Sequence, residues 1–243
     1  TALDTAFGAL TAENAANWFG GLTIGTLVTT AEELEDALNA GKAAILGNDI
    51  TLDTALIINE AADIDLNGYT LTTVGLELTQ GGNIADGTIA SGDNTAMTPH
   101  LMISGGSVTM DNVTIDVNHH LNANSEWSEA TGLEISNATA VLNNCNIKIN
   151  NQTKAKWVFS YGISLVNADL TVNGGSITAA CVAGTSANGP TNPNAISTIG
   201  NCTATLNNVI VDATYYCATV QGHATINTTD KTVTSAVIVD NRG

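Results

Sequence analysis

The chain has 243 residues and is strongly acidic, with 23 Asp and Glu against 6 Lys and Arg and a formal net charge of −17. Nucleic acids and anionic membranes are negatively charged and bind basic protein surfaces, so we expect this acidic chain to bind neither. No apolar run approaches the about 20 residues of a membrane span, and no membrane insertion is expected. Aromatic residues make up only 4%, so an interior of aliphatic side chains is predicted.

Residues 1–28 precede the repetitive part of the chain and form a segment of their own. Its apolar residues are interrupted by glycines, and exposed Phe and Trp would be a liability on a free monomer. We therefore predict that this segment docks on a neighbouring subunit as an anchor. The expected anchor residues are Leu3, Phe7, Leu10, Trp18 and Phe19.

A capping helix is predicted over residues 29–42. Thr30 and Glu33 have the spacing of a capping box. Leu34 lies on an apolar stripe, and Gly41 is a good C-terminal stop. We expect this helix to cover the open end of the strands that follow, whose edges would otherwise be unpaired.

The domain at 43–243 is dominated by four segments that superimpose without gaps. Each has an apolar residue, a second one seven positions later, Asn or Asp next, and a third apolar residue five beyond the second. Their matched middle residues lie 32, 30 and 34 positions apart, and they are Met110, Leu142, Val172 and Leu206. Such repetition is typical of a solenoid, and the alternation of apolar and polar residues indicates strands. The shared core is about twenty residues, so each coil is expected to carry an insertion of about ten or more.

A column of Asn or Asp recurs directly after an inward apolar residue. The position after it is always Gly or Asn, the residues that tolerate a left-handed backbone at a tight corner. Stacked amide side chains could hydrogen-bond from coil to coil and satisfy groups that the corner leaves unpaired. The predicted corner ladder is Asn67, Asp111, Asn143, Asn173 and Asn207.

This pattern resembles the right-handed parallel β-helix of the pectate-lyase-like superfamily, which includes pectin-degrading enzymes, phage tail spikes and bacterial surface proteins. The resemblance implies an all-β fold: a right-handed parallel β-helix of about seven to eight coils with an N-terminal capping helix. It leaves function open, because the fold hosts enzymes, adhesins and structural parts.

No catalytic set is expected. The resemblance to pectate lyases would imply calcium-binding Asp residues with an Arg or Lys base, but the only Arg is Arg242, near the C-terminus. Lys148 faces no acidic ladder, since its counterpart one coil earlier is Thr114 or Asp116. Hydrolysis of the polygalacturonase type would need two or three clustered carboxylates.

No metal site and no cofactor are expected either. His119 and His120 are adjacent, and neighbours in an extended segment point opposite ways, which favours a polar loop. Calcium bound by grouped carboxylates such as Asp63 and Asp65 is the one alternative.

The four cysteines lack metal-type spacing. Cys145 and Cys202 fall in repeat columns that suggest packed thiols. The pattern leaves open a disulfide from Cys181 to either Cys202 or Cys217.

Four insertions, at residues 91–99, 118–130, 150–161 and 181–194, follow the same point of their coils and should project from one edge. Aromatic residues in such loops suit a sugar-stacking surface or a protein interface, or they simply cover a flank of the solenoid. The candidate interface or ligand residues are Trp127, Trp157, Phe159, Tyr161, His119, His120, Lys154 and Lys156.

These features together favour a non-enzymatic structural protein displayed on a particle surface. We expect a phage virion decoration, fibre or spike protein at the virion surface, anchored by residues 1–28. Its partners would be other subunits of a large assembly, with homotrimerisation and a host glycan as further expectations. The alternative is a bacterial adhesin or surface-layer protein that binds glycan at the cell surface, and the second alternative is a polysaccharide lyase or hydrolase.

Overall fold

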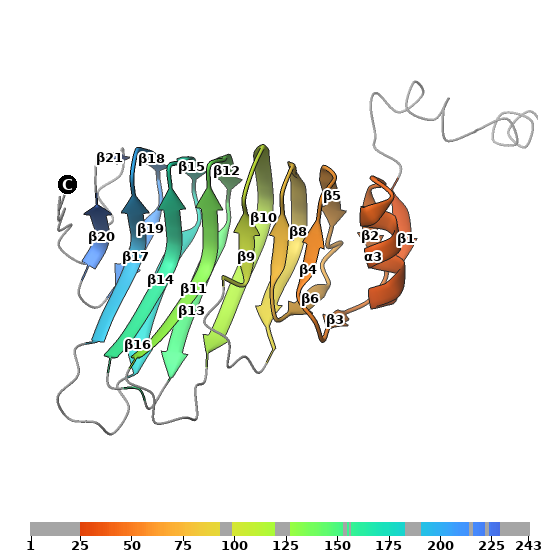
Figure 1. The fold of residues 1–243 in the computed structure, drawn as a ribbon, viewed down its shortest axis with the longest axis horizontal. Coiled ribbons are helices and arrows are strands. Elements are labelled where there is room, and N and C mark those ends of the chain that lie inside the picture. Colours follow the sequence, from red (N-terminus) through yellow and green to blue (C-terminus); the bar gives the residue numbers. More distant parts are fainter. Residues whose placement is uncertain are drawn as a thin grey trace, which may run out of the picture.

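The computed structural model describes residues 25–92, 99–119, 127–152, 155, 157–182, 191–213, 216–221 and 224–228. All five predicted anchor residues lie outside the described residues, namely Leu3, Phe7, Leu10, Trp18 and Phe19. His120, Lys154 and Lys156 lie outside them as well. The described part is an all-β parallel solenoid with a helix at one end (Figure 1).

The strands stack in three rows along the solenoid axis, and neighbours in a row pair in parallel. The first row comprises β1 (Thr26–Val28), β2 (Ala44–Leu46), β5 (Ala62–Asp65), the first part of β8 (Gly81–Ser91), the first part of β10 (Ser107–His119), β12 (Thr139–Asn143), β15 (Asp169–Asn173), β18 (Cys202–Asn207) and β21 (Ala224–Thr228). The second comprises β3 (Ile50–Leu52), β6 (Thr70–Thr73), the second parts of β8 and β10, β13 (Asn146–Gln152), β16 (Ser176–Val182) and β19 (Ile210–Ala213). The third comprises β4 (Leu56–Ile58), β7 (Leu76–Leu78), β9 (Leu101–Ile103), β11 (Trp127–Ser136), β14 (Trp157–Val166), β17 (Thr191–Ile199) and β20 (Tyr216–Gln221).

The core is a continuous aliphatic column inside these rows. In the first row Ile84 pairs with Met110 and Met110 with Leu142, and all three side chains are fully buried. Alternate residues face outward, because side chains of a strand point to opposite faces in turn. Each fully buried aliphatic side chain contributes about 1.5–3 kcal/mol, so the column supplies much of the folding free energy.

Coil length is not constant along the rod. The chain advances 20 residues from Ala44 to its partner Ile64, and 20 more to Ile84. Three successive coils are longer, with 32, 30 and 34 residues between partners in the corner ladder. The prediction of seven to eight coils that each carry an insertion is therefore wrong. In the described solenoid, three coils have the length that such an insertion gives. They are longer because their second-row and third-row strands extend beyond the core.

Helix α3 (Ala31–Asn39) begins where the capping box predicted. Thr30 accepts a hydrogen bond at Oγ1 from Glu33 N over 3.2 Å, and the Glu33 carboxylate accepts one from Thr29 N over 2.7 Å. The bond from the Thr29 backbone lowers the pKa of Glu33. Leu34 is fully buried in the same core as the strands, and the helix lies beside β1 and β2 (Figure 1).

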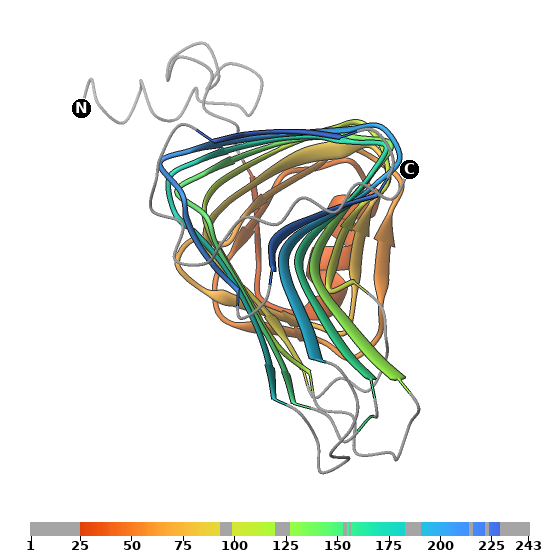
Figure 2. The same cartoon turned by 90° about the vertical axis from the view of Figure 1, so that its left-hand side faces the viewer.

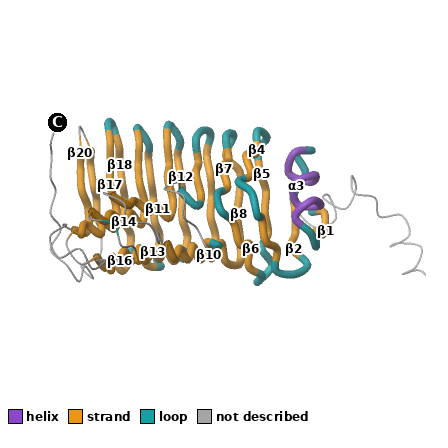
Figure 3. Tube along the Cα trace, turned by 60° about the horizontal axis from the view of Figure 1, so that its bottom comes forward, coloured by secondary structure: helices purple, strands orange, loops and turns teal. Residues whose placement is uncertain are grey.

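Tight corners connect the first row to the second, and short turns recur along the edges of the rod (Figure 3). The five positions predicted to be left-handed all have φ between 52° and 81°, and they are Gly68, Asn112, Asn144, Gly174 and Asn208. One position earlier, a ladder of side chains runs along the axis. Asn143 Nδ2 donates to Asp111 Oδ1 over 2.8 Å, and Asn173 Nδ2 donates to Asn143 Oδ1 over 2.9 Å. Asn207 Nδ2 continues the ladder to Asn173 Oδ1 over 2.8 Å.

Asn67 was predicted to belong to this ladder, and the structure shows that it does not. Its own φ is 51°, and its Nδ2 donates to the carbonyl of Leu46 over 3.0 Å. Asp65 and Thr70 pair with residues 85 and 88 of β8, so the corner of the earlier coil contains two extra residues. The extra residues move Asn67 out of the column that Asp111 occupies in its own coil.

Candidate functional site

Two rows of the solenoid continue beyond the core as a two-layered extension, which we name the flange (Figure 2). One layer consists of the ends of β10, β13 and β16, at residues 117–119, 149–152 and 179–182. The other consists of the beginnings of β11, β14 and β17, at residues 127–131, 157–161 and 191–194. These strands occupy much of the predicted insertions, so strand residues replace part of the expected loops.

Glycines allow the third row to bend onto the second at the base of the flange. A Cβ atom on Gly132 would lie 2.8 Å from the carbonyl oxygen of Gly162 and 3.3 Å from Ile147 Cγ2. One on Gly162 would lie 2.7 Å from the carbonyl oxygen of Ala195 and 2.8 Å from Ile177 Cγ2. Only glycine fits so close an approach between the third row and the second. Strands of the solenoid curve along their length (Figure 2).

The surface between the two layers, which we name the seam, holds buried polar side chains beside buried aliphatic ones such as Ile149 and Val158. Asn151 is fully buried, and its Nδ2 donates to the carbonyl of Phe159 over 2.8 Å and to Ser128 Oγ over 3.4 Å. Ser160 is also fully buried and donates from Oγ to the carbonyl of Ala180 over 3.0 Å. The seam therefore joins its layers by hydrogen bonds in addition to its buried aliphatic side chains.

Two buried imidazoles lie beside the seam. His119 ends β10 with none of its surface exposed, and His100, 1% exposed, precedes β9. His100 N donates to the carbonyl of Thr131, and its own carbonyl accepts from Leu76 N. Burial, and then the nearby His119, lower the pKa of His100 to about 4, although a hydrogen bond with the Thr73 backbone opposes them. The prediction that His119 lies in a polar loop is therefore wrong, because β10 carries it into the interior.

The predicted aromatic residues lie in strands rather than in loops. Phe159 and Tyr161 in β14 are half-buried and alternate with the seam residues of that strand. Trp127 and Trp157 are partners in register, and their side chains lie outside the described part. Burial, and then the charge of Glu129, raise the pKa of Tyr161 to about 12, so its hydroxyl stays protonated.

Half-buried carboxylates accompany these rings on the third row. Burial raises the pKa of Glu129, and burial followed by the charges of Glu129 and Glu77 raises that of Glu134. Glu77 accepts a hydrogen bond from Ser104 Oγ over 2.5 Å. Carboxylates, aromatic rings and hydroxyls on one face are the groups that bind sugars. The sequence carried no signal that places these glutamates beside the aromatic residues.

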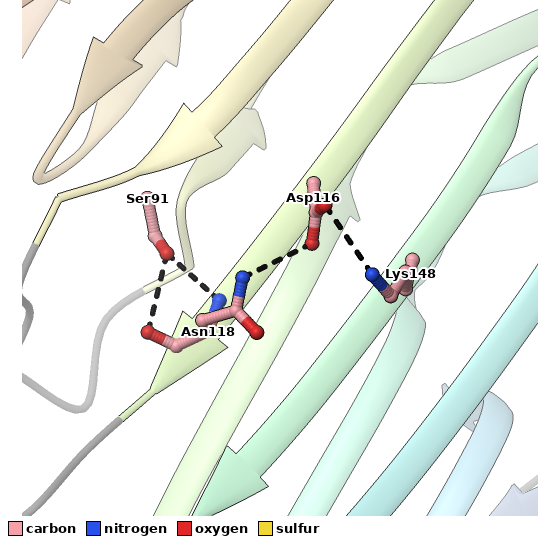
Figure 4. Close-up of polar contacts among 4 residues, drawn as sticks. All are labelled: Ser91, Asp116, Asn118 and Lys148. Atoms are coloured by element: carbon pink, nitrogen blue, oxygen red, sulfur yellow. Dashed lines mark hydrogen bonds and ion pairs between the residues drawn. The ribbon is translucent and has the colours of Figure 1, made fainter.

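Lys148, which the sequence did not favour as a catalytic base, lies on the outside of the second row (Figure 4). Lys148 pairs in register with Asp116, and its Nζ lies 3.4 Å from Asp116 Oδ2, with 58% and 33% of the side chains exposed. Asp116 Oδ1 accepts from Asn118 Nδ2 over 3.2 Å, and Asn118 N donates to Ser91 Oγ over 2.8 Å. An exposed pair of this kind contributes about 0–1 kcal/mol. It engages the ammonium with Asp116, which is the one carboxylate among the four residues of this cluster.

The carboxylates considered for calcium already accept hydrogen bonds. Asp63 Oδ1 accepts from Asn83 Nδ2 over 2.7 Å, and Asp65 Oδ1 accepts from Asn67 N over 2.8 Å. Within the ranges that the structure describes, no group of three or more His, Cys, Asp and Glu could hold a metal ion.

Two of the cysteines are free, buried thiols. Cys145 and Cys202 pack in the core, so a Cys181–Cys202 disulfide is not formed. Burial raises the pKa of Cys145 to about 11. Cys181 Sγ lies 3.0 Å from Ser160 Oγ in the seam, and the side chain of Cys217 lies outside the described residues.

Comparison with protein families, with characterised proteins and with solved structures found no match for this chain. Among the described residues, no helix has both the length and the apolar character needed to cross a membrane.

Proposed function

We propose that this chain is a non-enzymatic structural protein displayed on a particle surface, as a phage virion decoration, fibre or spike protein. The observation that supports this proposal is the combination of a stiff rod with a one-sided flange. Parallel rows tied by an amide ladder resist bending, and the flange adds surface along one edge only. A projecting rod with one specialised edge suits attachment at its end and contact along its side.

The finer assignments belong to the same proposal. The coils would have the right-handed sense of the pectate-lyase-like superfamily, which is the hand that parallel crossover connections overwhelmingly adopt. Helix α3 would cover the end of the rod, and residues 1–28 would anchor it to a neighbouring subunit. Three flanges could pack around a three-fold axis, so a homotrimer is proposed.

A glycan-binding adhesin is the second candidate, and the third-row surface favours it. Phe159 and Tyr161 offer aromatic faces for stacking against sugar rings, and Glu129 can accept bonds from sugar hydroxyls. This candidate assigns the same surface to a host or cell-wall glycan rather than to a protein subunit.

The deciding experiment is immunogold labelling of the native protein in its source culture, followed by electron microscopy. Label on virus-like particles is the expected result, and label confined to the cell envelope would overturn the virion proposal in favour of an adhesin. A chain without residues 1–24, which keeps β1 and its pairing with β2, should then fail to rejoin stripped particles. The paired variant Phe159→Ala, Tyr161→Ala should rejoin them, because the anchor lies elsewhere.

A further inference from the structure

We propose that the outer face of the third row binds a glycan whose sugars carry ammonium groups, such as a glucosamine polymer, along strands β11, β14 and β17. The inference rests on the glycan-binding candidate above and deepens it, because it names the charge of the sugar and the groups that recognise it. A virion spike and a surface adhesin could both use such a face.

The register of the third row places one set of side chains in a line on its outer face. Leu133, Ile163 and Ile196 are buried in the core, so the next residue of each strand turns away from it. These next residues are partners in register, namely Glu134, Ser164 and Ser197. Neighbouring strands lie about 4.8 Å apart, so a polymer that runs along the rod meets one of these groups at each strand.

A second line of outward side chains lies one step towards the flange. A Cβ atom on Gly132 or Gly162 would approach an isoleucine of the second row, so the residue before each glycine points away from that row. These residues are Thr131 and Tyr161, which are partners in register. Glu129 lies two positions before Thr131 on the same side of β11. The outer face therefore combines carboxylates, hydroxyls and an aromatic ring.

Three hydroxyls on this face are buried but have no hydrogen-bond partner in the structure. Thr131, Ser164 and Ser197 are 5%, 8% and 7% exposed, although all three turn away from the core. Within the described part of the chain, none of their side chains forms a hydrogen bond. Their oxygens are not fully enclosed, so a ligand can reach them. A polar group that is removed from water without a partner costs free energy, so a ligand that supplies hydrogen bonds here is favoured.

The charge of this face selects the kind of sugar. Among the described residues, no cation pairs with the carboxylates of Glu129 and Glu134. Burial raises the pKa of both glutamates, and the charges of Glu129 and Glu77 add to this effect at Glu134. An ammonium group would relieve the repulsion and would also be attracted by the ring of Tyr161. A glycan rich in carboxylates would meet like charge instead, so acidic polysaccharides are disfavoured.

The same line of outward side chains continues to the part of the rod near helix α3. Ile57, Glu77 and Met102 are partners in register on strands β4, β7 and β9, and they line a cavity of about 170 Å³. Met102 also pairs with Glu134, so the cavity lies at the end of the proposed binding face. Ile57 is 52% exposed and offers apolar surface on which the face of a sugar ring can pack.

The test is isothermal titration calorimetry of the full chain at pH 6.5 and 150 mM salt. The probes are a tetramer of glucosamine and the matched tetramer of N-acetylglucosamine, which lacks the charge. We expect the glucosamine tetramer to bind about tenfold more tightly or better, because a charged hydrogen-bond partner adds about that much. Equal affinity, or a preference for the acetylated tetramer, would overturn the inference and leave the glycan-binding candidate in place. Binding of neither tetramer would also overturn it, and a panel of other neutral glycans would then decide the glycan-binding candidate separately.

Variants separate this face from the general acidity of the chain. The double variant Glu129→Gln, Glu134→Gln should weaken binding of the glucosamine tetramer by about tenfold or more. The matched control Glu32→Gln, Glu35→Gln removes the same charge from exposed positions of α3, and the affinity should stay within about twofold. Equal losses in the two double variants would show that net charge alone attracts the probe, which would overturn the inference. Ser164→Ala leaves the charge unchanged and should weaken binding about fivefold, and an unchanged affinity would contradict the role of the hydroxyls.

Discussion

Asn143 donates a hydrogen bond from Nδ2 to Oδ1 of Asp111, 32 residues earlier in the chain, over 2.8 Å. Its own Oδ1 accepts from Asn173 Nδ2 over 2.9 Å, so one amide both donates and accepts along the axis. These contacts tie three coils together at a corner where the backbone leaves the regular pairing of the rows. The ladder therefore helps fix the register of the coils.

Replacing Asn143 by Ala should lower the free energy of unfolding by about 1–3 kcal/mol, because two half-buried partners lose their hydrogen bonds. Urea denaturation followed by circular dichroism would measure this as a lower midpoint with an unchanged slope. Asn146→Ala is the matched control, since Asn146 is exposed and accepts one bond, from Ser176 Oγ over 2.8 Å. Its cost should stay within about 0.5 kcal/mol. Equal costs at the two positions would contradict the structural importance of the ladder.

Two glycines with the same backbone φ angle should differ in the stability that is lost when each is replaced by alanine. Gly68 and Gly175 both have φ of 81°, but a Cβ on Gly68 would meet nothing within 4 Å. A Cβ on Gly175 would lie 1.9 Å from the carbonyl oxygen of Cys145, on the neighbouring coil. Gly68→Ala should therefore cost only the left-handed strain, about 1–2 kcal/mol. Gly175→Ala should cost more than about 4 kcal/mol, because the coils must separate. Calorimetric unfolding of the two variants measures the difference, and similar melting temperatures would refute this account of coil spacing.

The corners could be predicted from sequence because the repeat itself encodes them. A left-handed position needs Gly or Asn, and a stacked amide needs Asn or Asp in the same column, so both signals are visible without any contact information. Asn67 was misplaced because the two extra residues in its corner do not interrupt the local pattern. Only the pairing of Asp65 and Thr70 with β8 reveals them.

The flange could not be predicted in the same way. The repeat spacing indicated inserted residues, but their strand character depends on partners in the next coil and in the facing row. His119 was predicted to lie in a polar loop because it is adjacent to His120 and the two could not easily bind one metal ion. It instead continues the inward alternation of Val117 in β10. Its charge contributes to the lowered pKa of His100, which lies 19 residues earlier in the chain, and no local pattern encodes that relationship.

Helix α3 provides a test of the proposal that it covers the end of the rod. Leu34→Ala removes a fully buried side chain from the shared core and should cost about 2–5 kcal/mol. Leu27→Ala is the control, since Leu27 is 64% exposed, and it should cost less than about 0.5 kcal/mol. Thermal unfolding should be a single transition for both variants if the helix and the solenoid fold as one unit. A separate early transition in the Leu34 variant would show instead that the helix is dispensable for the rod.

The half-buried carboxylates predict a pH dependence of the opposite sign to that expected from His100, whose pKa is lowered by burial. Burial and the charges of Glu129 and Glu77 raise the pKa of Glu134 above 4.5, the ordinary value for a glutamate. The folded state therefore binds this proton more tightly than the unfolded chain does. Stability is therefore lost as the pH rises from the unfolded pKa through the folded one, and above that window the charged side chain opposes folding. Glu134→Gln should raise the melting temperature at pH 8 and give no gain at pH 4.

The gain should stay below about 1 kcal/mol, because the side chain is only half-buried and water screens its charge. Comparing each variant with the parent protein at the same pH removes the contribution of the histidines. Glu60→Gln is the matched control at an exposed position, and it should leave the melting temperature nearly unchanged at both pH values. If Glu134→Gln lowered the melting temperature at pH 8, the carboxylate would have to be bound in a favourable contact. The third-row surface would then contain a stabilising interaction rather than unrelieved negative charge.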